Sequence, residues 1–184
     1  NSGKMPSNCN MMNASRDYDL YNNGSVQAVS LPYGNGSFRM MLIMPLNTGI
    51  DDYIESLGYA GFLDIAKNLK TSGAHVYIPK FKMEFEQKLN ENLKKLGLDV
   101  AFWADRADFS RMYKGPDKLF ISEVKHKSYV EVGEDGTEAA AATSVGIGVT
   151  STPSLVKFNN PFVFIIYDTK TNTVMFIGKM EKPE

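Results

Sequence analysis

The sequence has few of the residues that form metal sites, disulfides and many catalytic centres. Its 184 residues include a single cysteine, Cys9, and two histidines, His75 and His126. One cysteine excludes an internal disulfide, and neither histidine has a second histidine at metal-ligand spacing. We therefore expect no metal ion and no other cofactor.

An excess of one charge and long apolar runs are also missing. Lysine and arginine number 20, and aspartate and glutamate 21, interspersed along the chain, so the sequence lacks a basic footprint for nucleic acid. The longest apolar runs, residues 40–44 and 162–166, are far shorter than the roughly 20 residues that span a bilayer. Because 43% of the residues are hydrophobic, we expect one globular domain with its own core.

Catalytic motifs are not evident. The alternation of Val124, His126 and Val130 predicts that His126 faces inward, which favours a buried, hydrogen-bonded histidine over a catalytic base. The segment Gly-Ile-Gly at 146–148 lacks the strand-to-helix context of a phosphate loop, and no serine lies in a nucleophile elbow. The sequence therefore predicts that the protein is not an enzyme.

Strand-like segments outnumber helical ones. Apolar or alternating patterns predict one strand that ends near residue 31. They also predict strands over residues 38–44, 75–87 (with a bulge at Pro79), 119–132, 155–168 and 173–180. One helical region, 51–69, is expected to split at Gly58 and Gly61. A second, 88–98, has Leu89, Leu93 and Leu96 on one stripe and ends at Gly97. This order predicts an α+β fold with large, mostly antiparallel or mixed sheets and a few short helices.

Residues 132–154 form a long segment without aromatic or basic side chains. Every second residue from Thr137 to Val149 is uncharged, as in a strand that buries one face. Its four consecutive alanines favour helix, and its glycines favour coil. The pattern alone leaves a surface loop, a helical turn and a buried strand open, and such a segment suits a conformational switch.

Four stretches of the chain resemble the serpins, the serine protease inhibitors. These stretches are "VSLPYGNGSFRMMLIMP", "VYIPKFKMEF", "SEVKHKSYVEVGEDGTEAAAATS" and "VKFNNPFVFIIYDTKTNTVMFIGKMEKP". The resemblance implies a serpin-like fold of which residues 1–184 are a single incomplete domain, about the C-terminal half. It also implies that residues 134–155, approximately, are the reactive-centre loop.

The resemblance implies a suicide-substrate mechanism, in which a protease cleaves the loop and the loop then inserts into the main sheet of a metastable protein. Insertion requires small, uncharged hinge residues. The implied hinge comprises Glu134, Gly136, Thr137, Glu138, Ala139, Ala140, Ala141 and Ala142. The family register places the reactive bond between Thr150 and Ser151. The small Thr150 side chain suits a protease of elastase-like or subtilisin-like specificity. The implied target is a serine protease, and the resemblance leaves cysteine proteases open as a further class of target.

The resemblance also assigns residues outside the loop. His126 matches a histidine beneath the point where the sheet opens, and Lys80 and Glu134 match an ion pair at the top of that sheet. A half-domain would expose a sheet edge, so we expect the N-terminal half of the fold or a second copy as partner. An extracellular or cell-surface location is expected. The alternative function is a non-inhibitory carrier, binding module or self-assembling fragment.

Overall fold

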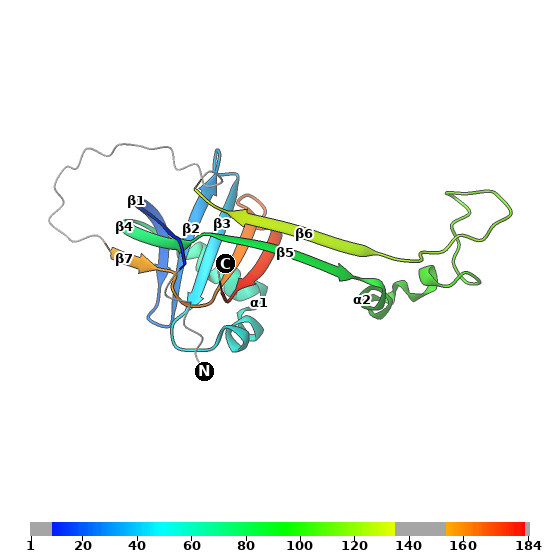
Figure 1. The fold of residues 1–184 in the computed structure, drawn as a ribbon, viewed down its shortest axis with the longest axis horizontal. Coiled ribbons are helices and arrows are strands. Elements are labelled where there is room, and N and C mark those ends of the chain that lie inside the picture. Colours follow the sequence, from blue (N-terminus) through cyan, green and yellow to red (C-terminus); the bar gives the residue numbers. More distant parts are fainter. Residues whose placement is uncertain (1–8, 135–153, 183–184) are drawn as a thin grey trace. The chain divides into compact units, whose positions relative to one another are not determined.

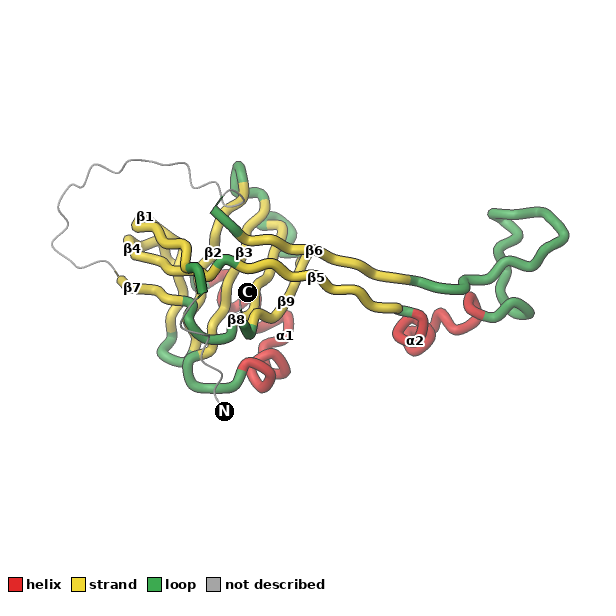
Figure 2. The backbone as a smooth tube through the Cα atoms, viewed as in Figure 1, coloured by secondary structure: helices red, strands yellow, loops and turns green. Residues whose placement is uncertain are grey.

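The computed structural model describes residues 9–134 and 154–182. The chain divides into two compact units. The larger consists of Asn1–Phe81 and Glu131–Glu184, and the smaller of Lys82–Val130. The larger unit contains an extensive sheet with one helix, and the smaller unit consists of a strand pair with short helical turns and loops (Figures 1 and 2).

The sheet of the larger unit has seven strands in the order β7-β4-β1-β2-β3-β8-β9. The strands are β1 (Met11–Asn22), β2 (Val26–Tyr33), β3 (Phe38–Pro45), β4 (Lys70–Pro79), β7 (Ser154–Lys157), β8 (Phe162–Asp168) and β9 (Val174–Met180). All neighbouring pairs are antiparallel except β4 and β7, which run parallel. The expected mixed, mainly antiparallel sheet is therefore present.

The predicted hairpin formed by β2 and β3 is confirmed. Its turn closes with a 2.8 Å hydrogen bond from the Gly36 amide to the Tyr33 carbonyl, and Gly36 has a φ of 82° that favours glycine. Residues 40–45 are all buried, as expected for a strand that is apolar on both faces.

The helix α1 (Ile50–Lys67) begins with the acidic pair Asp51 and Asp52, as predicted. It kinks at Gly58, whose φ of 49° and ψ of 176° are not helical, so the predicted break there is confirmed. The predicted break at Gly61 is wrong, because the helix continues and anchors Phe62 and Ile65 in the core. The core cluster comprises Val26, Ala28, Met41, Ile43, Ile50, Phe62, Ile65, Val163, Ile165 and Tyr167.

Two predicted strands are each divided in the structure. The chain leaves the large sheet after Pro79 and enters a second sheet as β5 (Phe81–Lys88), so residues 75–87 do not form one bulged strand. Residues 155–168 form β7 and β8, which belong to different places in the sheet. In both cases a proline marks the division, Pro79 or Pro161, because proline cannot donate to a strand ladder.

The strand β1 was not predicted from the sequence. It makes ten consecutive residue pairs with β4, from Met11 opposite Pro79 to Leu20 opposite Lys70. Only Tyr18 in β1 is fully buried, because most of its side chains are polar and half-exposed. The strand therefore depends on backbone pairing and lacks the apolar alternation that reveals strands in a sequence.

The smaller unit contains β5 paired with β6 (Lys125–Val132), and between them α2 (Asn90–Leu93), η1 (Lys94–Leu98) and η2 (Asp99–Phe102). The predicted helix 88–98 is thus divided, and Gly97 lies inside η1 rather than after a regular helix. The predicted strand 119–132 begins only at Lys125. The side chain of Asn90 bonds the Ser122 carbonyl and the Val124 amide, at 3.0 and 2.8 Å, so this backbone is already paired.

Substitution of Gly178 in β9 tests the packing of the sheet. A Cβ added there would lie 2.3 Å from the ring of Phe164, which is 2% exposed. We expect Gly178→Ala to lower the free energy of unfolding by about 1–3 kcal/mol, since the ring is confined by the core. Urea denaturation of the full-length protein measures the effect.

Gly73→Ala in β4 is the matched control, because an added Cβ there makes only an ordinary 3.6 Å contact with Asp17. We expect its free energy of unfolding to stay within roughly 0.5 kcal/mol of the wild type. Equal effects of the two substitutions would contradict the assigned packing of Gly178 against Phe164.

Candidate reactive-loop site

The predicted reactive-centre loop lies between β6 and β7. Its predicted hinge from Gly136 to Ala142 and its predicted reactive bond between Thr150 and Ser151 lie outside the described residues. The structure does describe both ends of this segment, Glu134 on one side and Ser154 on the other, and the contacts of these ends define the candidate site.

The distal end of the segment is attached to β4. Strand β7 runs parallel to it, with Ser154 opposite Ala74 and Lys157 opposite Tyr77. The amide of Phe158 then donates to the Tyr77 carbonyl at 3.0 Å. Val156 and Phe158 are 3% and 0% exposed, so apolar burial holds this end in addition to the backbone pairing.

The proximal end lies beside the residue that follows β4. Val132 is buried at the end of β6, and two residues later the Glu134 carboxylate approaches the Lys80 ammonium to 3.2 Å. The structure thus brings the predicted pair together. Its side chains are 41% (Lys80) and 68% (Glu134) exposed, so solvent screens the attraction and the pair is typically worth about 0.2–1 kcal/mol.

The two attachment points are close in comparison with the length of chain that joins them. Along an extended strand, Ala74 and Lys80 are separated by roughly 20 Å. Residues 135–153, fully extended, would reach on the order of 60 Å. The segment is therefore about three times longer than a direct connection requires, and this surplus needs a functional explanation.

His126 does not face inward. The structure places it on an exposed part of β6, with its ring centroid 6.4 Å from that of Phe85. The prediction of a buried histidine is wrong for the described residues. Along β6 the alternation becomes buried only at its end, where Val132 is covered, because the described part of the chain pairs this strand with β5 alone.

The strand pair β5–β6 carries cross-strand ion pairs on one face. Lys88 contacts Glu123 at 2.6 Å, and Glu86 contacts Lys125 at 3.1 Å. The hydrogen bond from Lys88 lowers the pKa of the Glu123 carboxyl and raises the pKa of Lys88 itself. Within the described residues, β5 is the strand partner of β6.

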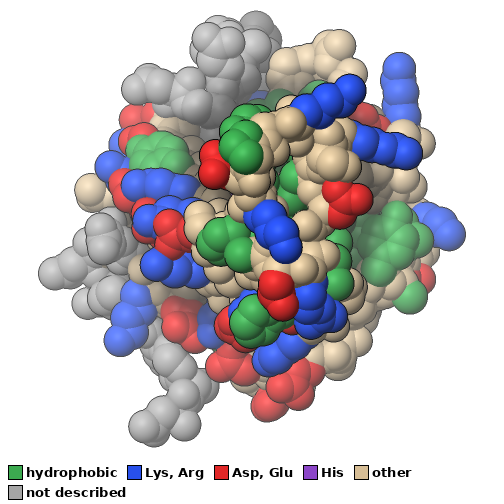
Figure 3. Space-filling model, turned by 90° about the vertical axis from the view of Figure 1, so that its right-hand side faces the viewer, with side chains coloured by type: hydrophobic (Ala, Val, Ile, Leu, Met, Phe, Trp, Pro, Cys, Tyr) green, Lys and Arg blue, Asp and Glu red, His purple; other side chains and the backbone are tan. Residues whose placement is uncertain are grey.

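Other types of site find no support in the described ranges. No cluster of three or more His, Cys, Asp or Glu side chains there could hold a metal ion, and no helix there is long and apolar enough to cross a membrane. On the face drawn in Figure 3, acidic and basic side chains are intermingled and neither sign forms a continuous patch.

The sheet also contains a cluster of polar side chains that was not predicted from the sequence. Ser30, which is 1% exposed, bonds Arg39 and lies 3.3 Å from the Tyr167 hydroxyl, although Tyr167 is 137 positions away in the chain. A serine and an arginine inside the apolar strands β2 and β3 were the available signals. Neither reveals its partner, because the contact depends on the pairing of β3 with β8.

Comparison with known proteins identifies the class of this fold. The family model for serpin (serine protease inhibitor) matches residues 2–183. An uncharacterized serpin-like protein of Thermococcus kodakarensis is 34% identical over 95% of this chain and 41% of its own length. A leukocyte elastase inhibitor of Xenopus laevis is 36% identical over 84% of this chain and 42% of its own length.

Solved structures agree with this result. The thermophilic serpin tengpin, in its native state, superimposes with a TM-score of 0.74 and 36% identity, over 94% of this chain and 46% of its own. The chain therefore belongs to the serpin family. It spans less than half the length of these relatives.

The contribution of the Lys80–Glu134 ion pair to the attachment of the loop end can be measured as a coupling free energy. In a double-mutant cycle with Lys80→Met and Glu134→Gln, we expect a coupling free energy below about 1 kcal/mol, because both side chains are well exposed. Urea unfolding of the full-length protein provides the four values.

The exposed pair of Lys179 and Asp51, at 2.7 Å, is the matched control and should give a coupling of similar size. A coupling above roughly 2 kcal/mol for Lys80 and Glu134 alone would show that this pair is more than a solvated surface contact.

Proposed function

We propose that the protein inhibits serine-type proteases as a suicide substrate and that residues 134–155 are its bait. The observation that carries this proposal is the surplus length of the segment between two attachment points on β4 and Lys80. Membership of the serpin family supports the proposal, as does the name of a relative, the leukocyte elastase inhibitor.

The proposed mechanism has two stages. A protease cleaves the bond between Thr150 and Ser151 and remains joined to Thr150 as an acyl-enzyme. The residues from Gly136 onward then insert beside β6 as a new strand, which removes the protease from the loop end before water can complete hydrolysis. The uncharged alternation from Thr137 and the pairing of β6 with β5 in a sheet of two strands support this step.

The proposed roles of the sheet residues follow from this insertion. Lys80 and Glu134 would hold the start of the loop where insertion begins, and the 3.2 Å contact between them supports that role. His126 would lie near the opening of the sheet and would become covered when a strand is added to β6. Its side chain is exposed in the structure, as this role requires before insertion.

A gel assay tests inhibition directly. The full-length protein is incubated with an elastase-like protease and separated under denaturing conditions. We expect a covalent adduct that survives detergent. Cleavage at the loop without an adduct would contradict inhibition and would indicate the alternative, a non-inhibitory carrier or binding module.

The hinge can be tested by a charge on the face of the proposed strand that contains Thr137 and Ala139. We expect Ala139→Asp, or Thr137→Arg, to change the inhibitor into a substrate, because an unpaired charge buried in a sheet costs several kcal/mol, typically about 3–5. The yield of detergent-stable adduct should fall at least tenfold while the cleavage rate stays normal.

Ala140→Asp is the matched control. Position 140 shares its face with Glu138, a residue that already carries a charge, so the aspartate should leave the adduct yield near the wild-type value. Unchanged adduct formation by Ala139→Asp would show that the loop does not insert in this register.

Specificity can be tested at the proposed reactive bond. We expect Thr150→Arg to redirect the protein toward trypsin-like proteases, since an arginine there would pair with an acidic specificity pocket. Mass spectrometry of the peptide released by wild-type cleavage should show Ser151 as its first residue. A peptide that begins more than two residues away would contradict the assigned bond.

A further inference from the structure

Two identical triplets, Asn-Gly-Ser, occupy two turns of the larger unit, at residues 23–25 and 35–37. The first lies between β1 and β2, and the second lies between β2 and β3. Asparagine followed by glycine occurs nowhere else in the sequence, and both of these asparagines are exposed. Because the two triplets match in sequence and in exposure, a difference in their chemical reactivity has to come from their contacts.

The side chain of Asn23 is held by three hydrogen bonds. Its Oδ1 accepts from the amides of Ser25 and Val26, at 3.0 and 2.8 Å. Its Nδ2 donates to the Tyr21 hydroxyl at 3.1 Å. Both ends of this side-chain amide are therefore fixed, and the group can turn only after several bonds have opened.

The side chain of Asn35 is held by a single bond. Its Oδ1 accepts from the Ser37 amide at 3.1 Å, and its Nδ2 has no partner among the described residues. One exposed hydrogen bond is a small barrier to rotation of the side chain. The amide group of Asn35 is therefore much freer to turn than that of Asn23.

The glycine amides that follow the two asparagines are held equally. The Gly36 amide donates to the Tyr33 carbonyl, and the Gly24 amide donates to Asn22 Oδ1, in both cases at 2.8 Å. A Cβ added at either glycine would meet nothing within 4 Å, so both backbones lie in open space. The difference between the two triplets consequently lies in the asparagine side chains.

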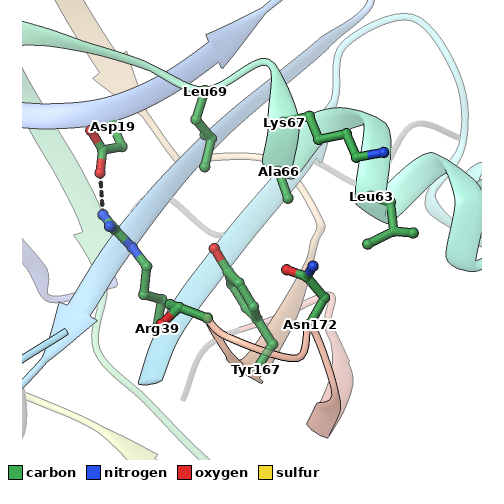
Figure 4. Close-up of a pocket in the computed structure, with 9 residues that line it drawn as sticks. Asp19, Arg39, Leu63, Ala66, Lys67, Leu69, Tyr167 and Asn172 are labelled. Atoms are coloured by element: carbon green, nitrogen blue, oxygen red, sulfur yellow. Dashed lines mark hydrogen bonds and ion pairs between the residues drawn. The ribbon is translucent and has the colours of Figure 1, made fainter. Parts of the chain in front are cut away.

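The turn that joins β8 to β9 contacts the second triplet. Thr169 Oγ1 donates to the carbonyls of Gly36 and Ser37, at 3.2 and 3.1 Å. These contacts adjoin the paired residues Arg39 of β3 and Tyr167 of β8, which lie side by side in Figure 4. The turn is thus supported from one side through its backbone, whereas the Asn35 side chain extends into solvent.

We propose that Asn35 is a site of spontaneous deamidation in the folded protein and that the contacts of Asn23 protect it from the same reaction. Asparagine is a chemically labile side chain, and a following glycine leaves the attacking backbone nitrogen unhindered. The reaction requires Cγ of the asparagine to approach that nitrogen, so the side-chain bonds have to open first.

The reaction at Asn35 proceeds through a succinimide. The Gly36 nitrogen loses its proton to hydroxide and attacks Cγ, so an N–Cγ bond forms. The Cγ–Nδ2 bond breaks, and the leaving nitrogen takes a proton from water and departs as ammonia. Water then opens the ring. Cleavage of the new N–Cγ bond gives aspartate, and cleavage of the original peptide bond gives isoaspartate, which leads the main chain through Cγ.

Both products change the hairpin. Aspartate adds a negative charge and keeps an oxygen that can accept from the Ser37 amide. Isoaspartate also inserts one additional carbon into the main chain, inside a turn that the Gly36–Tyr33 bond closes. The modified protein therefore differs from the original in charge and, for isoaspartate, in the geometry of the β2–β3 connection.

Ageing of the full-length protein tests the proposal. The protein is made in a host that does not glycosylate asparagine, and it is incubated at mildly alkaline pH, both folded and in urea. Chymotrypsin separates the triplets, because Leu31 and Tyr33 lie between them, and mass spectrometry then measures conversion of each amide to the acid. In the folded protein we expect Asn35 to react at least about fivefold faster than Asn23.

The unfolded protein is the matched control, because the two identical triplets should then react at equal rates, within about twofold. Equal rates in the folded protein would overturn the proposal. So would faster reaction at Asn23, or an unreactive Asn35 in a folded protein whose urea-unfolded form reacts.

Two substitutions test whether the contacts control the rates. Asn22→Ala frees the Gly24 amide, so it should raise the rate at Asn23 roughly two- to fivefold and leave Asn35 unchanged. Thr169→Val removes the hydroxyl contacts with the second triplet, so it should raise the rate at Asn35 by a similar factor, about two- to fivefold, and leave Asn23 unchanged. Rates at both asparagines that stay at their wild-type values in both variants would refute control by these contacts.

Discussion

Strand β4 is the support on which the candidate reactive site depends. It pairs with β1 over ten residues on one side and holds β7 on the other, so both the sheet edge and the distal loop end rely on it. The chain then leaves the sheet at Lys80, beside the proximal loop end. Strand β4 thereby fixes the distance between the two ends of segment 135–153, and this distance is much shorter than the segment's extended length.

This arrangement explains how the two ends of the proposed reactive segment are held. Val132, Val156 and Phe158 are buried at these ends. Val156 also pairs with Val76, and the Phe158 amide donates to the Tyr77 carbonyl. The exposed contact of Lys80 with Glu134 adds little energy and orients the first residues after β6. A weak contact at this position is compatible with the proposed insertion, in which the start of the loop would move.

The sequence predicted the elements whose signals are local. The β2–β3 hairpin, the start of α1 and the kink at Gly58 each follow from turn glycines or acidic residues within a few positions. The pair of Lys80 and Glu134 was found only through the family resemblance, since nothing in the spacing of two residues 54 positions apart indicates contact.

The missed features depend on distant pairing. Strand β1 is polar and becomes a strand because β2 and β4 flank it, and His126 is exposed because β6 has only one partner in the described structure. The contacts around Ser30 likewise require that β3 and β8 meet. Local propensity contains no information on which strand will lie beside another.

The pairing of β3 with β8 has a consequence for synthesis of the chain. Ile43 lies opposite Val163, so the smaller unit and the candidate loop are both made between the two halves of this pair. At about 5–20 residues per second, the apolar edge of β3 waits on the order of ten seconds for its neighbour. The growing chain therefore exposes the apolar residues 40–45 of β3 to solvent until Phe162 and the residues after it emerge.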